Sequence, residues 1–521
     1  MKIILSLYSD IPTKLTSTGS RFRLPNFYEA LVKSLAKYND VLLLVNNDLI
    51  HYQHVSNKAI DGFIAKQYGK CVEEFDPDLI IAVNNSFCSD FKYKEDCPYL
   101  ILTVDSIKCL VDYPNIKCNK NTYILIPALG MVEEAEELGF DSKNIIYSLS
   151  PTGLYAEKLT YVHDISFIGS VFTNGILSNI SEKIHSKYKK EFDDVINSYE
   201  NDRKTRFTKR ISAKLSQEIN HIKSSDLFIK QYFDKIDMFC LNDISQKFRK
   251  GVLLEASKFN LGLYGTPDWL EQDHDISKAY VKGFFYSTKH NQDIYNSSKI
   301  NLNICHKQAI GGFPWRITDI MASNGMLLSD DSIKNTWNKM YPSIKLPFYS
   351  SKNEISKICK KYLSEVNLRK DLISQCQEEV DKNHRFENMF DIISDAICLN
   401  LTHKNTETIT YTSNQIENFI SAKDYDIEKK NHFFKKILNY TIYFIVNIYA
   451  SFKKIFKYLF PGIFKYIKSK AYIRNAITKL EILMKFRLTF KSIKRGGIPT
   501  QLDDLYNYKF DESLISRFLK K

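Results

Sequence analysis

The stretch NLNICHKQAIGGFPWRITDIMASNGMLLSD, residues 301–330, decides which fold this chain adopts. It opens with an apolar run and continues through a loop that contains Gly311 and Gly312. Pro314 then suits the first turn of a helix, because a proline at that position loses no helical hydrogen bond. The run GMLLSD (325–330) follows as a second apolar segment. The order strand, loop, helix and strand predicts one βαβ unit of a parallel sheet.

The same alternation extends toward the N-terminus. DISFIGS (164–170) and FNLGLYG (259–265) predict two further strands, separated by a long charged helical section. Earlier apolar runs predict strands at 3–8, 41–45, 79–83, 99–104, 123–127 and 145–149, with helices at 26–38, 59–75 and 132–139. Apolar runs without alternation are typical of strands buried on both faces, as in parallel sheets. We therefore expect an α/β chain with two Rossmann-like domains in tandem.

The chain is long enough for two domains and an appendage. We expect an N-terminal Rossmann-like domain over residues 1–155. A second such domain is expected over 156–400, with a helical insertion at about 177–250. Residues 401–428 are polar and rich in Thr and Asn, which predicts a linker. Residues 429–521 then form a basic tail, which we expect to be helical and amphipathic.

Composition excludes several protein classes. Hydrophobic residues make up 44% of the chain and charged residues 26%, which is the balance of a soluble globular protein. The 10 cysteines contain no C-x-x-C pair, so we expect free buried thiols in a reducing compartment. The N-terminal run MKIILSLYSD is too short for a secretory signal and is expected to be the first strand. No stretch of about 18 uncharged apolar residues predicts a spanning helix.

Two segments carry residues suited to binding an anion. In open α/β sheets a ligand lies beyond the carboxyl ends of the strands, where backbone N–H groups favour negative charge. Gly169 and Ser170 follow the predicted strand 164–168, where a glycine lets the backbone approach a diphosphate. The alternative is that Gly169 only makes an ordinary turn.

Arg316 and Asp319 lie in the helix that follows Pro314. The first turn of a helix favours an acidic residue, so a cation at Arg316 is better explained if an anion docks beside it. The carboxylate of Asp319 suits the two hydroxyls of a ribose. Its alternative is a carboxylate on the helix surface that pairs with Arg316 at i,i+3.

Taken in order, three segments resemble a known family. DISFIGS, FRKGVLLEASKFNLGLYG (248–265) and the stretch 301–330 are similar to the spore-maturation-protein-like glycosyltransferases of the GT-B superfamily. The similarity covers most of residues 150–400, with a weaker likeness at LILTVDS (100–106). It implies two Rossmann-like domains, with a nucleotide-sugar donor bound by the second, and transfer of the sugar to an acceptor.

The resemblance also implies donor-binding residues. Gly169, Ser170 and Arg316 would lie at the phosphates, Tyr264 and Gly265 near the base, His306, Gly311 and Gly312 near the sugar or diphosphate, and Asp319 at the ribose. Such enzymes stabilise the leaving diphosphate with positive side chains and helix dipoles. The resemblance therefore implies neither a metal nor another cofactor, and the absence of a DxD motif at a predicted strand end agrees with this. The pair Asp330-Asp331 is expected in a surface turn.

The catalytic groups are less well defined. Many retaining members of the superfamily carry two glutamates in the pattern E-x7-E, and here Gly311 and Asp319 occupy those positions. The missing first glutamate leaves retaining or inverting stereochemistry open. A base for an inverting mechanism would come from the first domain. Asp105 and Asp10, each after a predicted strand, are the candidates, although an Asx-turn or helix cap is the alternative for both.

The tail holds much of the net charge of +13. From Lys429 to Arg495, Glu481 is the only acidic residue, and aromatic and aliphatic residues recur at helical spacing. Basic amphipathic helices suit an anionic membrane surface. The alternative is a helical appendage packed on its own domains or on another subunit. Nucleic acid fits less well, because the aromatic residues form an apolar stripe.

These observations lead to one functional expectation and two alternatives. We expect a cytoplasmic enzyme, bound through residues 429–495 to the inner face of the cell membrane, that transfers a sugar from a nucleotide-diphosphate donor to a glycan or lipid-linked acceptor. The alternatives are a nucleotide-sugar epimerase and a catalytically degenerate scaffold for glycan assembly. The sugar, the base, the acceptor and the anomeric outcome stay open.

Overall fold

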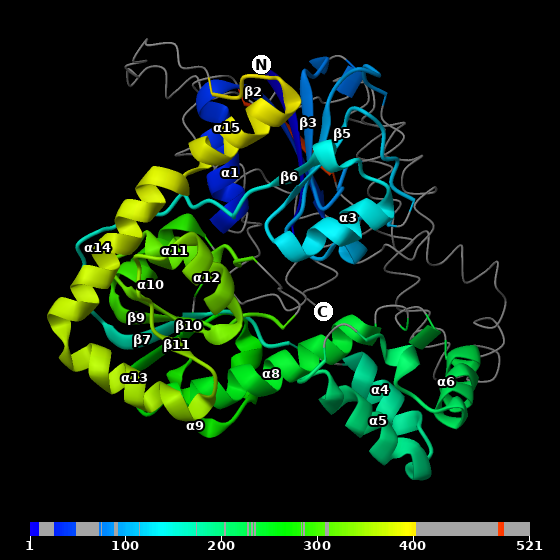
Figure 1. Ribbon diagram of the computed structural model, residues 1–521, viewed down its shortest axis with the longest axis vertical. Coiled ribbons are helices and arrows are strands. Elements are labelled where there is room, and N and C mark those ends of the chain that lie inside the picture. The colour runs from blue at the N-terminus through cyan, green and yellow to red at the C-terminus, as the bar shows by residue number, and fades with distance from the viewer. Residues whose placement is uncertain are drawn as a thin grey trace, which may run out of the picture.

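Two parallel sheets, each covered by helices, make up the body of the molecule (Figure 1). The computed structural model describes residues 1–9, 26–47, 488–493 and, apart from gaps of one to four residues, 72–402. This confirms the predicted α/β class with two Rossmann-like sheets. Most of the helix expected at 59–75 lies outside the described residues.

The first sheet has the strand order β12-β2-β1-β3-β4-β5-β6 as far as the structure describes it. Its strands from the N-terminal part of the chain are β1 (Lys2–Ser9), β2 (Asp40–Asn47), β3 (Leu79–Val83), β4 (Tyr99–Leu102), β5 (Thr122–Ile126) and β6 (Ile145–Tyr147), and they pair in parallel. Helices α1 (Asn26–Tyr38) and α3 (Val132–Leu138) connect and cover them. Every residue of β3 is buried, as expected for a strand covered on both faces.

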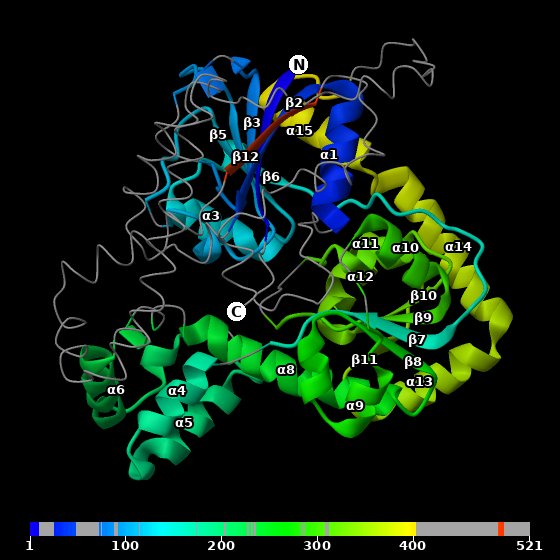
Figure 2. The same ribbon diagram turned by 180° about the vertical axis from the view of Figure 1, so that it is seen from behind.

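The tail returns to this sheet. Strand β12 (Leu488–Ile493) pairs antiparallel with β2 and lies at the edge of the sheet (Figure 2). The helical prediction for 429–521 is therefore wrong at these residues. The physical reason is that an edge strand offers free backbone donors and acceptors, and the sequence LTFKSI contains residues that favour strands. Residues 403–487 and 494–521, which hold the rest of the predicted linker and tail, lie outside the description.

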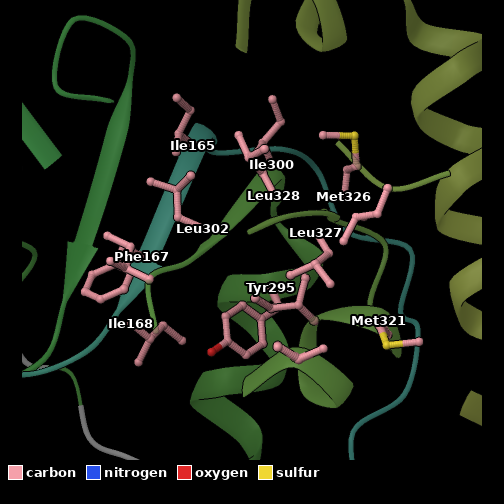
Figure 3. Close-up of a cluster of buried hydrophobic side chains, with 14 of the residues drawn as sticks. Ile165, Phe167, Ile168, Tyr295, Ile300, Leu302, Met321, Met326, Leu327 and Leu328 are labelled. Atoms are coloured by element: carbon pink, nitrogen blue, oxygen red, sulfur yellow. The ribbon is translucent and has the colours of Figure 1, made fainter. Parts of the chain in front are cut away.

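The second sheet has the strand order β11-β10-β9-β7-β8, with parallel pairing throughout. Its strands are β7 (His163–Ile168), β8 (Leu261–Tyr264), β9 (Ser298–Asn303), β10 (Met326–Asp330) and β11 (Phe348–Tyr349). Helices around it are α9 (His274–Ala279), α10 (Thr288–Asn296), α11 (Arg316–Met321), α12 (Lys334–Met340), α13 (Lys352–Ser364) and α14 (Val366–Asn383). Phe167, Leu302 and Leu328 come from the neighbouring strands β7, β9 and β10, and they lie in one core cluster (Figure 3).

A helical insertion follows β7. Helices α4 (Gly175–Lys183), α5 (Ser186–Ser198) and α6 (Ala213–Ser225) stand away from both sheets and lead into the long helix α8 (Ile236–Ala256) (Figure 1). The first half of α8 packs into the core of the insertion through Ile236 and Ile244. Its second half packs on the second sheet through Val252 and Leu253. One continuous helix therefore joins the insertion to the second domain.

The last helix of the body belongs to the first sheet. Helix α15 (Phe386–Ile397) buries Phe386, Phe390 and Ile393 in the core that β1 and β3 share. The predicted second domain extended to residue 400, so this boundary is corrected. An apolar stripe on a helix shows that one face is buried, but does not show which sheet buries it. None of the helices in the described ranges is long and apolar enough to cross a membrane.

Candidate functional site

The two domains contact each other through loops that follow their strands and through helices. We call the edge at which the parallel strands of a sheet end its carboxyl edge. Ala128, just after β5, forms an antiparallel bridge with Gly312, in the loop after β9. A Cβ atom on Gly312 would lie 2.5 Å from the carbonyl oxygen of Pro127, so this contact needs a glycine. Gly311, predicted beside it, lies outside the described residues.

Helix α1 of the first domain docks on the second. The ring of Phe27 stacks on that of Trp315 with 4.9 Å between centroids. Oε2 of Glu29 accepts a hydrogen bond of 3.0 Å from the backbone N–H of Thr288, the first residue of α10. These contacts fix the two carboxyl edges relative to each other. The residue before α11 is therefore part of the contact between domains.

Glycines bring the ends of β7 and β8 together. The register aligns Ile168 with Tyr264, and the N–H of Gly169 donates to the carbonyl of Tyr264 at 2.9 Å. Nε1 of Trp269 donates to the carbonyl of Gly169 at 2.7 Å. A Cβ atom on Gly265 would lie 1.9 Å from that same carbonyl oxygen, and Gly265 has a φ of +147°. We call this close contact between the two backbones the crossing of Gly169 and Gly265. The sequence could not show that these residues lie so close together.

Tyr264 places its side chain differently from the prediction of a contact with the base. Its hydroxyl lies 2.7 Å from Nε2 of His163, the first residue of β7. The side chain therefore extends back along the strand, away from the carboxyl edge. Only the backbone of Tyr264 faces the crossing of Gly169 and Gly265. The base contact stays a prediction, and the direction of the hydroxyl does not support it.

Arg316 begins α11, in the first turn as predicted. Its guanidinium lies 5.0 Å from the ring centroid of Phe167 in β7. Nη1 lies 3.4 Å from Oδ1 of Asn303, at the end of β9, and Nη2 lies 3.4 Å from the position of a Cβ on Gly169. A cation thus stands between two strand ends and directly beside a glycine turn. This arrangement suits an oxyanion such as a diphosphate.

Asp319 lies one turn further along α11 and faces the first domain. Its side chain is buried, with 3% exposure, so the alternative of a surface carboxylate is wrong. One oxygen accepts from Nδ2 of Asn26 at 2.6 Å, and the other from Oγ1 of Thr152 at 2.5 Å. Burial, only partly offset by these bonds and by Arg316, raises the pKa of Asp319 to about 7. Both oxygens are engaged in the domain contact, so a ribose would have to displace a partner.

His306 lies in the loop after β9. Its Nε2 is 2.6 Å from Oδ1 of Asn242 on α8. Burial, together with the nearby charges of Arg249 and Lys307, lowers the pKa of His306 to about 3. The imidazole is therefore neutral at physiological pH. It can exchange hydrogen bonds with a sugar hydroxyl but brings no positive charge to a diphosphate.

Asp330 ends β10 in the interior and not in the surface turn that was predicted. It is fully buried, with 0% exposure. Oδ2 accepts from the backbone N–H of Cys305 at 2.6 Å, and Oδ1 accepts from that of Ser332 at 3.0 Å. Asp331 is exposed, as predicted. The carboxylate of Asp330 holds the loop after β9 against the end of β10.

Asp105 lies on the carboxyl edge of the first sheet. Its Oδ2 accepts from Nδ2 of Asn84, which follows β3, at 2.7 Å. The preceding residue, Val104, packs against the same core as Trp315. Asp105 therefore stands on the edge that faces the second domain, and its role as a base stays a prediction. Asp10 lies outside the described residues.

The sequence analysis missed Arg249, which lies on α8 behind the same edge. Its side chain has 3% exposure, and it donates to the carbonyls of Ser170 and Ile304. The signal was present in the sequence. Arg249 lies three and four residues before Val252 and Leu253, so its charged side chain is on the same buried face of the helix as these two residues. A cation in such a face indicates a specific set of acceptors.

Two cavities in the described part of the chain lie away from these residues. One cavity of about 510 Å³ lies in the helical insertion, between residues of α4, α5 and α8. Another, of about 350 Å³, lies at the opposite edge of the first sheet and is lined by Met1, Lys2, Asp40, Asp76 and Asp78. Across the residues that the structure describes, no three His, Cys, Asp or Glu side chains come together as metal ligands would. The site is defined by strand ends and cations.

Sequence comparison assigns a family to part of the chain. Residues 248–395, from the middle of α8 to α15, match a family described as glycosyl transferase-like. The matched segment contains Tyr264, His306, Gly312, Arg316 and Asp319. The narrower likeness to the spore-maturation-protein-like members stays a prediction, and no curated protein matches the sequence.

Several solved structures also align with the chain. The β-glucosyltransferase of T4 phage has 12% identity and a TM-score of 0.38, covering 77% of this chain and 100% of that one. HepE of Anabaena, solved with UDP and glucose, has 9% identity and a TM-score of 0.38, covering 76% and 99%. TarM of S. aureus, solved with UDP and glycan ligands, has 11% identity and a TM-score of 0.32, covering 63% and 58%. Strand order and register alone establish the two parallel sheets.

Proposed function

We propose that this chain transfers a sugar from a nucleotide-diphosphate donor, bound at the carboxyl edge of its second sheet, to a glycan or lipid-linked acceptor. The observation that carries the proposal is the position of Arg316. Its guanidinium lies between the ends of β7 and β9, beside the turn at Gly169. The glycosyltransferase-like family match covers Arg316 and the strand ends around β9.

The chemistry of this edge fits the departure of a diphosphate. Negative charge grows on the leaving diphosphate as the bond to the sugar breaks. A guanidinium donates two parallel hydrogen bonds to phosphate oxygens, and preorganised backbone N–H groups add to the stabilisation. Arg316 supplies the guanidinium, and the loop that follows Gly169 is the proposed source of the backbone donors. Leaving-group stabilisation by these groups, without a metal, is part of the proposal.

The acceptor enters from the first domain. Asp105 stands on the facing edge, and its carboxylate is of the kind that removes a proton from an attacking hydroxyl. The basic tail between Lys429 and Arg495 brings the enzyme to an anionic membrane, where a lipid-linked acceptor is present. Peripheral attachment to the inner membrane face is the proposed location.

A binding screen tests the donor site. The full-length chain is heated with a panel of nucleoside diphosphates and nucleotide-sugars, and its melting temperature is followed. A ligand at about 100 times its dissociation constant stabilises a protein by about 2.7 kcal/mol. We expect one base to raise the melting temperature and Arg316→Gln to abolish the rise. The control is Lys299→Gln, because Lys299 pairs with Asp164 at the opposite edge of the same sheet.

Turnover separates an enzyme from a scaffold. The nucleotide-sugar that binds best is incubated with the chain and membranes, and release of nucleoside diphosphate is measured. Release that depends on Arg316 supports sugar transfer, whereas binding without release favours the degenerate scaffold. Sedimentation with anionic and neutral vesicles tests the attachment. Equal binding to both kinds of vesicle contradicts the proposed role of the basic tail.

A further inference from the structure

Helix α8 presents a row of polar side chains to both loops at the carboxyl edge of the second sheet. The row consists of Asn242, Ser245, Gln246 and Arg249, and we call it the α8 row. Its members are spaced three and four residues apart, so they share one face of the helix. This face lies where α8 passes from the core of the insertion to the core of the second domain.

The α8 row fixes the loop that follows β7. Nη1 of Arg249 donates to the carbonyl oxygen of Ser170 at 2.5 Å. Oε1 of Gln246 accepts from the backbone N–H of Phe172 at 3.1 Å. Gly169, at the start of the loop, is held by Tyr264 as described above. The loop is therefore anchored from two sides.

The same row fixes the loop that follows β9. Nη2 of Arg249 donates to the carbonyl oxygen of Ile304 at 3.3 Å. The Nε2 of His306 meets Asn242, and Oγ of Ser245 accepts from the backbone N–H of Lys307 at 2.9 Å. Arg249 thus joins the two strand-end loops through one guanidinium.

Arg249 places a second positive charge at the end of β7. Its guanidinium lies 5.2 Å from the ring centroid of Phe167 and 4.2 Å from that of Phe172. Arg316 lies 5.0 Å from the same Phe167 ring. Arg249 is buried behind the loops and Arg316 begins a helix beside Gly169. Both cations act on the same small region of the carboxyl edge.

The hydrogen bond to Ser170 also determines where a backbone donor points. In a planar trans peptide, the C=O and the following N–H point in opposite directions. Because Arg249 holds the Ser170 carbonyl, the N–H of Val171 is directed away from α8. Outward N–H groups in a strand-end loop are the groups that bind phosphate oxygens. In the α8 row, the buried Nε2 of Gln246 has no hydrogen-bond acceptor among the described residues.

We propose that Arg249 is a positioning residue for the donor diphosphate: it holds the loops after β7 and β9 so that their backbone donors, together with Arg316, meet the phosphate oxygens. The inference rests on the proposed function and names a device within the same donor site. Arg249 acts through Ser170 and Ile304, since its own guanidinium is buried.

The test separates a specific loss of phosphate affinity from a general disturbance of the structure. Inorganic pyrophosphate is one probe, and the nucleoside of the diphosphate that binds best is the other. Both are titrated into the full-length chain, Arg249→Lys and Arg249→Gln. The control is Lys247→Gln, which also removes a positive charge from α8 but pairs with Asp243 and Asn197 in the insertion.

We expect the dissociation constant for pyrophosphate to rise about tenfold in Arg249→Lys, which corresponds to about 1.4 kcal/mol. Lysine keeps the charge but cannot join two carbonyls as the guanidinium does. Arg249→Gln should weaken pyrophosphate binding further. The affinity of both Arg249 variants for the nucleoside, and both affinities of Lys247→Gln, should stay within twofold of the wild type.

Two results would overturn the inference. One is pyrophosphate binding by Arg249→Gln within twofold of the wild type, and the other is an equal loss of pyrophosphate and nucleoside affinity. If both Arg249 variants fail to fold, Gln246→Met decides, because it releases the N–H of Phe172 alone. An unchanged ratio of the two affinities in that variant rejects the proposal. A wild-type chain that binds no nucleoside diphosphate removes the proposed function first, and this inference with it.

Discussion

The carboxyl edges of the two sheets arise from the same kind of parallel strands but carry different chemistry. On the second sheet, Gly169 and Gly265 cross at close range, and Arg316 stands beside them. On the first sheet, Asn84 and Asp105 occupy the strand ends, and Asn84 adopts a positive φ of 47°. One edge is suited to a phosphate and the other to a hydroxyl.

The comparison teaches that strand order alone does not assign a substrate to an edge. Both sheets end in loops with backbone donors, which is the common property of open parallel sheets. The difference lies in the side chains that border those loops. Cations and glycines favour a close approach by an anion. Carboxylate and amide oxygens instead favour a ligand that donates a hydrogen bond, such as a hydroxyl. Two substitutions test this division, and a third tests the contact between the two domains.

The largest effect is expected at the first edge. Asp105→Asn removes the proposed base but keeps an oxygen that can accept from Asn84. Loss of a general base lowers turnover by about 10²–10⁴-fold. We expect kcat to fall by such a factor while the dissociation constant of the donor stays the same. Steady-state kinetics and donor titration measure the two quantities.

Asp331→Asn serves as the matched control for Asp105→Asn, because Asp331 is an exposed carboxylate at the end of the second sheet. Unchanged turnover in Asp105→Asn would remove its role as base. A loss of donor affinity would instead assign Asp105 to the donor side and would erase the distinction between the two edges.

Much of the second sheet and its edge was accessible from the sequence. The continuous apolar runs and the order of strand and helix around 301–330 sufficed to predict parallel strands, and Arg316 was predicted to lie in a first turn. These features are local, because they depend on residues near in sequence. The prediction succeeded where local pattern and final structure agree.

What the sequence did not reveal depends on contacts between distant segments. Asp319 is bonded to Asn26, which lies 293 positions earlier, so no local pattern could show that it is buried. The same holds for α15, which packs on the first sheet, and for β12, which pairs with β2. Arg249 shows the opposite case: its spacing from Val252 and Leu253 is a local pattern that indicates a buried cation, but the sequence analysis did not predict one there.

A smaller effect is expected from Gly265→Ala. Its Cβ would lie 1.9 Å from the carbonyl oxygen of Gly169, and the φ of +147° is unfavourable for alanine. We expect the free energy of unfolding to fall by about 3 kcal/mol or more and donor binding to be lost, because the turn at Gly169 must shift. Thermal unfolding and donor titration are the measurements.

Gly139→Ala separates backbone strain from the close contact. Gly139 also has a positive φ, of +107°, but the nearest atoms to its Cβ lie 3.9 Å away. This variant should lose only about 1–2 kcal/mol and keep its donor affinity. Equal losses in the two variants would show that the crossing of Gly169 and Gly265 has no special role.

The smallest effect is expected at Asp319, which lies in the domain contact and not on either edge. Burial raises its pKa to about 7 in the folded chain, from the ordinary value of 3.8 for an aspartate. Between those values the folded state binds a proton that the unfolded state has released, so stability decreases as pH rises from about 4 to about 7. Above pH 7 the folded chain carries the full penalty of a buried carboxylate.

Asp319→Asn should remove this pH dependence. A neutral amide can accept from Asn26 and donate to Thr152, so the variant keeps both contacts. We expect it to be more stable than the wild type at pH 8, on the order of 1 kcal/mol, and nearly equal at pH 4. Denaturant unfolding across this range measures the difference. If Asp319 binds the ribose, the variant must also lose donor affinity at every pH. If it only joins the domains, donor affinity stays within a few-fold, and the donor site is confined to the strand ends and Arg316.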